Sequence, residues 1–266
     1  MQGRLSKKSG KLQSFPWERW REEFFEAKAI GFNQIEWLVD EELVSNNPIA
    51  SIEGRKEIAE LSDKHNIIVN SLCAHSFIDG NLLANYPYSK EAKENFLTLL
   101  NYAVQANIQL VCLPVMDKFS LKSFEAKKIL KNLLLDTYED HKDIKILLEC
   151  DLPADEIKVF LDDVGLKNVR ILYDLGNATA LGFDIETEIK LLHSYIGEIH
   201  LKDRYKDNGQ SERLGRADTS FNTVAKVLKK LSWQGNIILE TPILDDWREE
   251  AKKNYLFAKK FVDSIK

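Results

Sequence analysis

Short apolar runs of strand length alternate with longer amphipathic segments along the chain, and this alternation constrains the fold more than any other feature. Several runs are apolar at consecutive positions, as expected for strands covered on both faces. Such alternation is typical of parallel α/β folds. Seven strands are predicted, at Gln34–Val39, Ile67–Cys73, Ile108–Val115, Lys145–Glu149, Val169–Asp174, Glu198–Lys202 and Asn236–Glu240.

Eight amphipathic helices are predicted around these strands. The first should run from about Trp17 to Ile30, with Gly31 at its C-terminal cap. A barrel of eight strand–helix units typically needs about 250 residues. We therefore expect an α/β (β/α)8 TIM barrel, with residues 1–266 forming one domain. The other predicted helices are Ile52–His65, Lys90–Asn107, Leu121–His141, Ala154–Val164, Ile185–Ser194, Phe221–Leu231 and Trp247–Ser264.

One strand is missing from this count. It should precede the first helix, where only Met1–Ser6 and a polar stretch are available. We therefore expect a first strand that is abbreviated or truncated at the N-terminus. A start upstream of Met1 is one explanation, which an in-frame apolar strand in the upstream DNA would support.

Composition and charge narrow the classes of partner. A hydrophobic content of 44% with 30% charged residues is ordinary for a soluble globular protein. The net charge of −5 argues against a nucleic-acid partner. The N-terminus lacks the apolar run of a signal peptide, and no apolar stretch approaches the ~20 residues of a membrane helix. With three cysteines and no CxxC pair, we expect free thiols in the cytoplasm and no membrane partner.

Four of the predicted strands end in a potential metal ligand. These residues are Glu149, Asp174, His200 and Glu240, which lie 25, 26 and 40 residues apart. The carboxyl ends of barrel strands converge on one face. Three carboxylates and one imidazole suit Mn²⁺, Mg²⁺ or Co²⁺, and also Zn²⁺. Unrelated polar residues at strand ends are the alternative, which is reasonable for any one of them and much less so for all four.

Strand parity sharpens this expectation. Residues at i and i+2 share one face of a strand. If Glu149 points into the barrel, Leu147 does so too and Cys150 faces the helices. By the same rule His200 and Lys202 point inward together. The metal site is therefore expected inside the barrel mouth.

Further motifs accompany these residues in a fixed order. They are Gly31-Phe-Asn-Gln-Ile-Glu36, Ser71-Leu-Cys-Ala-His75, Leu148-Glu149, Tyr173-Asp174-Leu-Gly-Asn177, His200-Leu-Lys-Asp203, Leu214-Gly-Arg-Ala217 before Phe221, and Leu239-Glu240. With these motifs the chain resembles the xylose isomerase-like TIM barrels, a sugar phosphate isomerase/epimerase superfamily, and within it ketose 3-epimerases such as L-ribulose/L-xylulose-5-phosphate 3-epimerase.

The resemblance implies an enzyme, a metal-dependent sugar isomerase or epimerase. The four strand-end residues would bind one divalent metal, and Glu149 and Glu240 would also be the catalytic acid and base. Proton transfer would pass through a metal-bound cis-enediolate of a ketose or ketose phosphate. The expected partner is a small sugar or sugar phosphate. A homodimer is a second expectation.

The resemblance also suggests residues that bind substrate, each with a structural alternative. Glu36 could instead be a buried hydrogen-bond partner of a backbone group, and Lys202 could pair with a neighbouring carboxylate. Arg204 and Arg216, in loops, could be solvated. In the loop before the last-but-one helix, Ala217 stands where the epimerases usually have a second glycine, which puts the specificity in doubt. The substrate-binding candidates are Glu36, His75, Asn177, Lys202, Arg204 and Arg216.

Other functions on the same barrel stay open. Hydroxypyruvate isomerase or an inosose-type dehydratase would use the same metal site, because proton abstraction beside a carbonyl opens all these reactions. An endonuclease IV-like phosphodiesterase would need more histidines at strand ends than His75 and His200. A sugar-binding barrel without activity would be favoured if no metal bound.

Overall fold

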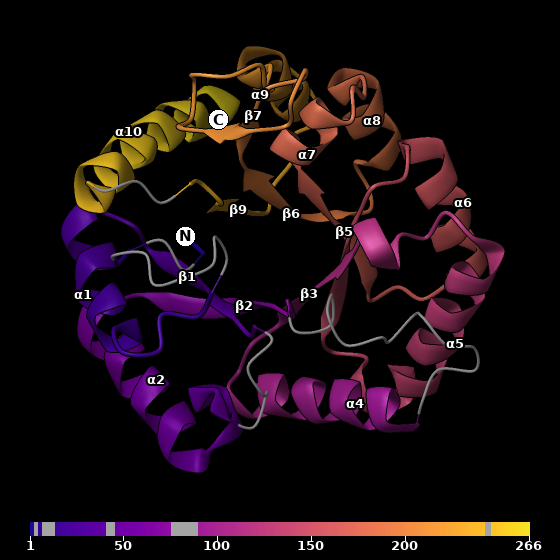
Figure 1. The fold of residues 1–266 in the computed structure, drawn as a ribbon, viewed down its shortest axis with the longest axis horizontal. Coiled ribbons are helices and arrows are strands. Elements are labelled where there is room, and N and C mark those ends of the chain that lie inside the picture. The colour runs from indigo at the N-terminus through magenta and orange to yellow at the C-terminus, as the bar shows by residue number, and fades with distance from the viewer. Residues whose placement is uncertain (3–4, 7–13, 41–45, 76–89, 243–245) are drawn as a thin grey trace.

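A parallel sheet of seven strands forms the centre of the molecule, and a ring of helices surrounds it (Figure 1). The computed structural model describes residues 1–2, 5–6, 14–40, 46–75, 90–242 and 246–266. The strand order β1-β2-β3-β4-β5-β6-β9 follows the chain, as expected for a TIM barrel. The strands are β1 (Gln34–Leu38), β2 (Ile68–Cys73), β3 (Leu110–Val115), β4 (Lys145–Cys150), β5 (Val169–Asp174), β6 (Ile196–Leu201) and β9 (Asn236–Leu239).

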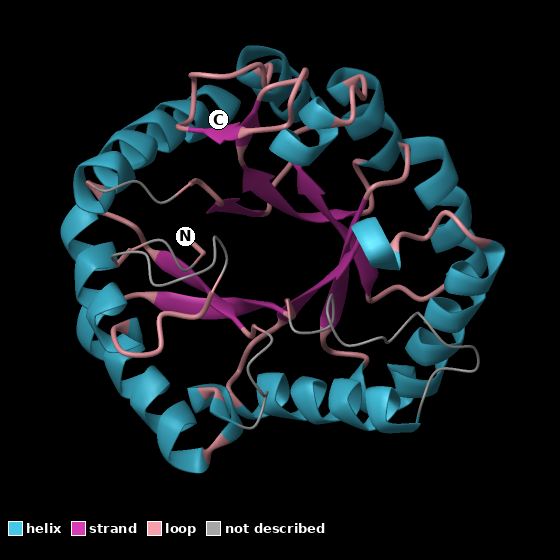
Figure 2. Ribbon diagram, viewed as in Figure 1, coloured by secondary structure: helices cyan, strands magenta, loops and turns pink. Residues whose placement is uncertain are grey.

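The helices cover the outside of the sheet (Figure 2). All eight helices expected from the sequence are present, with boundaries that differ by a few residues. None of the helices in the described ranges is long and apolar enough to cross a membrane. They are α1 (Trp20–Ile30), α2 (Ile52–His65), α4 (Lys90–Gln105), α5 (Phe124–His141), α6 (Ala154–Val164), α8 (Ile185–Leu192), α9 (Phe221–Lys230) and α10 (Trp247–Ile265).

Met1 and Gln2 occupy the position of the missing first strand. Gln2 forms a parallel bridge with Glu36, and the amide of Glu36 donates to the carbonyl of Met1 at 3.0 Å. The amide of Gln2 donates to the carbonyl of Leu239 at 3.3 Å. Met1 and Gln2 thus lie between β1 and β9, where Figure 1 places the N-terminus. The barrel is nearly closed, and the expectation of an abbreviated first strand is confirmed.

Burial and capping explain the boundaries of these elements. Every residue of β3 is buried, as its continuous apolar run predicted. Gly31 ends α1 in the left-handed region at a φ of 113°, which a residue without a side chain adopts at little cost. The start expected at Trp17 is wrong, because the amide of Arg19 bonds to the carbonyl of Pro16 and the chain turns before α1 begins.

Two small elements after the barrel strands were not expected. A six-residue helix, α7 (Leu175–Ala180), follows β5 directly. An antiparallel hairpin of β7 (Asp203–Arg204) and β8 (Ser211–Glu212) follows β6. Elements this short have no hydrophobic period to detect in a sequence. Both lie at the carboxyl ends of the strands, where the candidate site is.

Candidate active site

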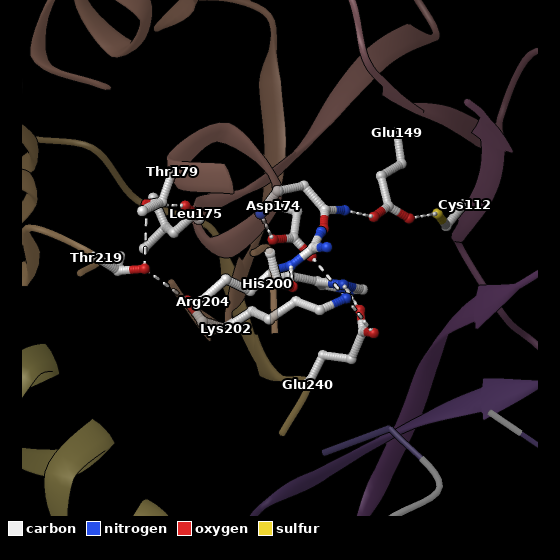
Figure 3. A network of polar contacts seen from close by, with 12 residues as sticks. Cys112, Glu149, Asp174, Leu175, Thr179, His200, Lys202, Arg204, Thr219 and Glu240 are labelled. Carbon is white, nitrogen blue, oxygen red and sulfur yellow. Dashed lines mark hydrogen bonds and ion pairs between the residues drawn. The ribbon is translucent and has the colours of Figure 1, made fainter. Parts of the chain in front are cut away.

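Four buried residues converge at the carboxyl ends of the strands. Glu149 lies in β4, Asp174 ends β5, His200 lies in β6 and Glu240 directly follows β9. Each offers one potential ligand atom, and these atoms lie within 4.8 Å of one another. We call these residues, together with Lys202, the upper cluster (Figure 3). The structure therefore brings together all four metal ligands expected from the sequence.

Lys202 is the cation of the upper cluster. Its Nζ atom lies 2.6 Å from Glu240 Oε1 and 3.6 Å from Asp174 Oδ2. Its side chain is 14% exposed, so most of this contact is shielded from water. The other oxygen of Glu240, Oε2, lies 3.0 Å from His200 Nδ1. Lys202 thus takes the carboxylate pairing that the sequence left open for it.

Burial and mutual repulsion change the charge states of the upper cluster. Burial, reinforced by Asp174 and Glu240, raises the pKa of Glu149 to about 8. Burial also raises the pKa of Asp174, against the opposing effect of Lys202. Burial alone would lower the pKa of His200, but Glu36 and Glu240 outweigh it and raise that pKa well above its usual range. The crowding of three buried carboxyl groups therefore favours protonation of Glu149 and of His200 in the metal-free protein.

A second group of buried residues lies on the other side of His200. Its Nε2 atom is 3.2 Å from Glu36 Oε2 and 4.0 Å from Glu198 Oε1. The hydroxyl of Ser71 lies 3.1 Å from Glu36 Oε1 and 2.9 Å from Glu198 Oε1. We call Glu36, Glu198 and Ser71 the lower cluster. His200 thus contacts both clusters.

The lower cluster contains residues that sequence reasoning missed. Glu198 precedes His200 by two positions, so strand parity already placed it on the inward face of β6. Ser71 is the register partner of Glu36 in the neighbouring strand. Glu36 itself was expected at the substrate. It is 1% exposed, and its carboxylate is directed to Ser71 and His200.

Asn177 and Arg204 form a hydrogen-bonded chain that ends on Glu149. The amide nitrogen of the Asn177 side chain, Nδ2, donates to Glu149 Oε1 at 2.8 Å. Its carbonyl oxygen, Oδ1, accepts from Arg204 Nη1 at 2.6 Å. Arg204 is held in turn by a 2.6 Å bond from Nε to the carbonyl of Gly209. These hydrogen bonds fix both the orientation of the Asn177 amide and one oxygen of Glu149.

The remaining substrate candidates lie at the rim. His75 is half-buried two residues after the end of β2. Arg216 is exposed in the loop after β8. This loop is fixed from below by Asp203, whose Oδ2 atom accepts the amides of Gly215, Arg216 and Ala217 at 2.8, 2.9 and 3.0 Å. Ala217 keeps a negative φ and Gly215 alone takes the left-handed region here, at 79°.

The donor set of the upper cluster fits a divalent cation. Hard cations prefer carboxylate oxygens, and imidazole nitrogen is accepted by transition metals such as Mn²⁺ and Co²⁺. Asp174 Oδ2 is buried and has no hydrogen-bond partner within the described residues. Buried polar atoms normally have a partner. A cation bound by the four strand-end residues would supply one for this oxygen.

Comparison with known families gives one match that spans most of the chain. The model of the family described as xylose isomerase-like TIM barrel matches residues 24–261. A curated protein of Escherichia coli (strain K12), named "Putative L-ribulose-5-phosphate 3-epimerase SgbU", is 35% identical over 89 residues. That alignment spans 31% of this chain and 29% of the curated protein.

Solved structures share the fold at low sequence identity. A D-psicose 3-epimerase from Clostridium cellulolyticum H10, solved with D-tagatose, superposes with a TM-score of 0.74 at 15% identity, over 91% of this chain and 93% of that one. A xylose isomerase-like TIM barrel protein from Mycobacterium smegmatis, solved in complex with magnesium, gives a TM-score of 0.69 at 12% identity, over 99% and 95%. These likenesses support the barrel architecture.

Proposed function

The chain belongs to the xylose isomerase-like TIM barrel family, and on this basis we propose that it is a divalent-metal-dependent isomerase or epimerase of a ketose or ketose phosphate. We also propose that residues 1–266 act as one domain, which the family match over residues 24–261 supports. The observation that carries the activity is the convergence of two glutamates, one aspartate and one histidine within 4.8 Å in the barrel mouth.

In this proposal Glu149, Asp174, His200 and Glu240 hold the metal. A divalent cation at this place would stabilise the negative charge that develops on oxygen when a proton is removed beside a carbonyl. Mn²⁺, Mg²⁺ and Co²⁺ suit a set of three carboxylates and one imidazole best. The magnesium bound by the related barrel from Mycobacterium smegmatis supports a hard cation.

Glu149 and Glu240 are the proposed acid and base. They enter the upper cluster from different strands and flank Asp174 and His200 in Figure 3. In the metal-free protein, burial and the neighbouring carboxylates raise the pKa of Glu149 to about 8, so this carboxyl group exchanges a proton more readily near neutral pH than an exposed glutamate does. Glu240 is held in place by Lys202 and His200, whose nitrogens lie 2.6 and 3.0 Å from its two oxygens. One glutamate would remove the proton and the other would return one to the opposite face.

The substrate contacts follow from the rim of the site. We propose that His75, Lys202 and Arg216 contact sugar hydroxyls or a phosphate, and that Arg204 and Asn177 do so while they orient Glu149. The name of SgbU supports a ketose phosphate as the substrate class. The D-tagatose bound in the D-psicose 3-epimerase supports a free ketose. An assay with both classes decides between them.

The test combines metal analysis with a substrate panel. Protein purified without chelators should contain a divalent ion and should convert at least one ketose or ketose phosphate. Glu149→Gln should lower that activity by about 10²–10⁴-fold, the usual contribution of an acid/base residue. Glu188→Gln is the control, since Glu188 is a buried glutamate bonded to the amide of Ala154. A protein that neither contains nor takes up a divalent ion would contradict the proposal.

A further inference from the structure

His200 has a carboxylate against each of its ring nitrogens. Nδ1 lies 3.0 Å from Glu240 Oε2, on the side of the upper cluster. Nε2 lies 3.2 Å from Glu36 Oε2, on the side of the lower cluster. The His200 and Glu36 side chains are 0% exposed, so water does not compete for either contact. A neutral imidazole carries one N–H, so it can donate to only one of the two carboxylates.

Glu36 is held in place by the strand next to its own. The hydroxyl of Ser71 lies 3.1 Å from Glu36 Oε1, and the two residues are register partners in β1 and β2. The other oxygen, Oε2, is buried and forms no hydrogen bond within the described residues, and the same holds for His200 Nε2. The two atoms lie 3.2 Å apart, so each is available as the hydrogen-bond partner of the other.

We propose that Glu36 is a positioning residue that accepts a hydrogen bond from His200 Nε2–H and so directs the lone pair of Nδ1 into the upper cluster. A metal-binding imidazole must be neutral and must present a lone pair, and the group bonded to its other nitrogen selects the tautomer. The opposite tautomer would place a proton on Nδ1, between His200 and the metal. Glu36 thus acts on the metal through His200.

Glu198 is not equivalent to Glu36 in this respect. Both glutamates are buried and both contact Ser71. Glu198 Oε1 lies 4.0 Å from His200 Nε2, beyond hydrogen-bond distance, whereas Glu36 Oε2 lies at 3.2 Å. The pair therefore offers a matched comparison, because replacing either residue removes a buried carboxylate and a contact to Ser71. Only one replacement removes the acceptor for Nε2–H.

This inference rests on the proposed metal site, and its test is metal affinity rather than activity. We expect Glu36→Leu to weaken Mn²⁺ binding, measured by titration calorimetry on the full chain, by about 10–100-fold, the usual effect of losing such a partner. Glu36→Gln retains an oxygen acceptor and should stay within about 3-fold of wild type. Glu198→Leu should also stay within about 3-fold.

A second readout uses the unmodified protein and does not depend on the variants folding. ¹⁵N-histidine NMR of the Zn²⁺-loaded protein, with the His200 signals assigned by their loss in His200→Gln, reports which nitrogen carries the proton. We expect a protonated Nε2 and an unprotonated Nδ1. A protonated Nδ1, or equal Mn²⁺ affinity in wild type and folded Glu36→Leu, would overturn the role of Glu36. If wild type bound neither ion, the proposed function itself would fail.

Discussion

The upper and lower clusters meet at His200, yet they differ in how their buried negative charge is compensated. In the upper cluster, Lys202 pairs with Glu240 and lies 3.6 Å from Asp174. In the lower cluster, no lysine or arginine of the described chain pairs with Glu36 or Glu198. The upper cluster also reaches the barrel mouth, whereas the lower cluster is sealed, with exposures of 0–1%.

The difference indicates what each cluster is built to hold. A hydroxyl has one proton, so Ser71 can donate to only one of the two glutamates at a time. Burial and the neighbouring Glu36 raise the pKa of Glu198 to about 8, which favours the protonated form of this carboxyl group at neutral pH. Protonation thus lowers the negative charge of the lower cluster, although Glu36 Oε2 and Glu198 Oε2 form no hydrogen bond within the described residues. The upper cluster has three carboxyl groups and reaches the barrel mouth, which suits an exchangeable cation.

The largest expected difference in activity is between two variants that carry the same Glu→Gln substitution, one in each cluster. Glu240→Gln removes a proposed base and ligand, so we expect activity on the best substrate to fall by about 10³-fold or more. Glu198→Gln makes the same change in the lower cluster and should cost less than about 10-fold. Steady-state rates at saturating metal test this contrast. Comparable losses in the two variants would mean that the clusters are not functionally distinct.

Lys202 should matter most when no metal is bound. Lys202→Met leaves Glu240 and Asp174 without their cation, and breaking a buried pair costs about 3–5 kcal/mol. We expect denaturant unfolding in a chelator to show a loss of this size, and added Mn²⁺ to restore more stability to the variant than to wild type. Lys206→Met, at an exposed position, is the control. An unchanged unfolding midpoint in chelator would refute the role of Lys202.

Breaking the hydrogen bonds that link Arg204 through Asn177 to Glu149 should have a smaller effect on activity, specific to the upper cluster. Asn177→Leu removes one hydrogen bond to the carboxylate of Glu149, and bonds to charged groups contribute about 1.5–3 kcal/mol. We expect kcat to fall by roughly 10–100-fold. Arg204→Met should have a weaker effect alone and little further effect in the Asn177→Leu background. Fully additive losses in this double-mutant cycle would indicate that the two residues act separately.

A further effect is expected on the pH dependence of stability. Burial is the main cause that raises the pKa of Glu149 and of Glu198 from 4.5 to about 8. Between about pH 4.5 and 8 the folded, metal-free protein therefore binds more protons than the unfolded chain, so its stability falls as the pH rises. The slope is at most about 1.4 kcal/mol per pH unit for each group.

Unfolding in chelator across this window measures that slope. Glu198→Gln should flatten it, because an amide does not titrate, and Glu188→Gln should flatten it less, because Glu188 is outside both clusters. Stability that rises with pH in the metal-free protein would contradict the assigned charge states.

Much of the barrel was predictable because its strands are continuous apolar runs and its helices are amphipathic. β5 was predicted to the residue, and β1 and β4 to within one residue. The convergence of the four strand-end residues followed from their spacing and from strand parity. Glu198 was predictable in the same way, because it lies two residues before His200 on one strand.

Other features depend on information that spacing does not contain. The contact between Glu36 and His200 joins β1 to β6, and it requires the sheet to curve until distant strands face each other across the interior. The bonds of Asn177 to Glu149 and Arg204 depend on side-chain rotamers and on the β7–β8 hairpin, whose strands have two residues each. Local pattern therefore predicted the fold and the four candidate ligands, and tertiary packing decided how these side chains are oriented.

Metal stoichiometry is the measurement that tests the central claim most directly. Elemental analysis after equilibrium dialysis against Mn²⁺ should give one ion per chain in wild type and in Glu198→Gln. It should give none in Asp174→Asn, which removes the charge from the carboxylate whose Oδ2 atom has no hydrogen-bond partner in the described structure. No ion in wild type, or a full ion in Asp174→Asn, would contradict the assignment of the upper cluster as the metal site.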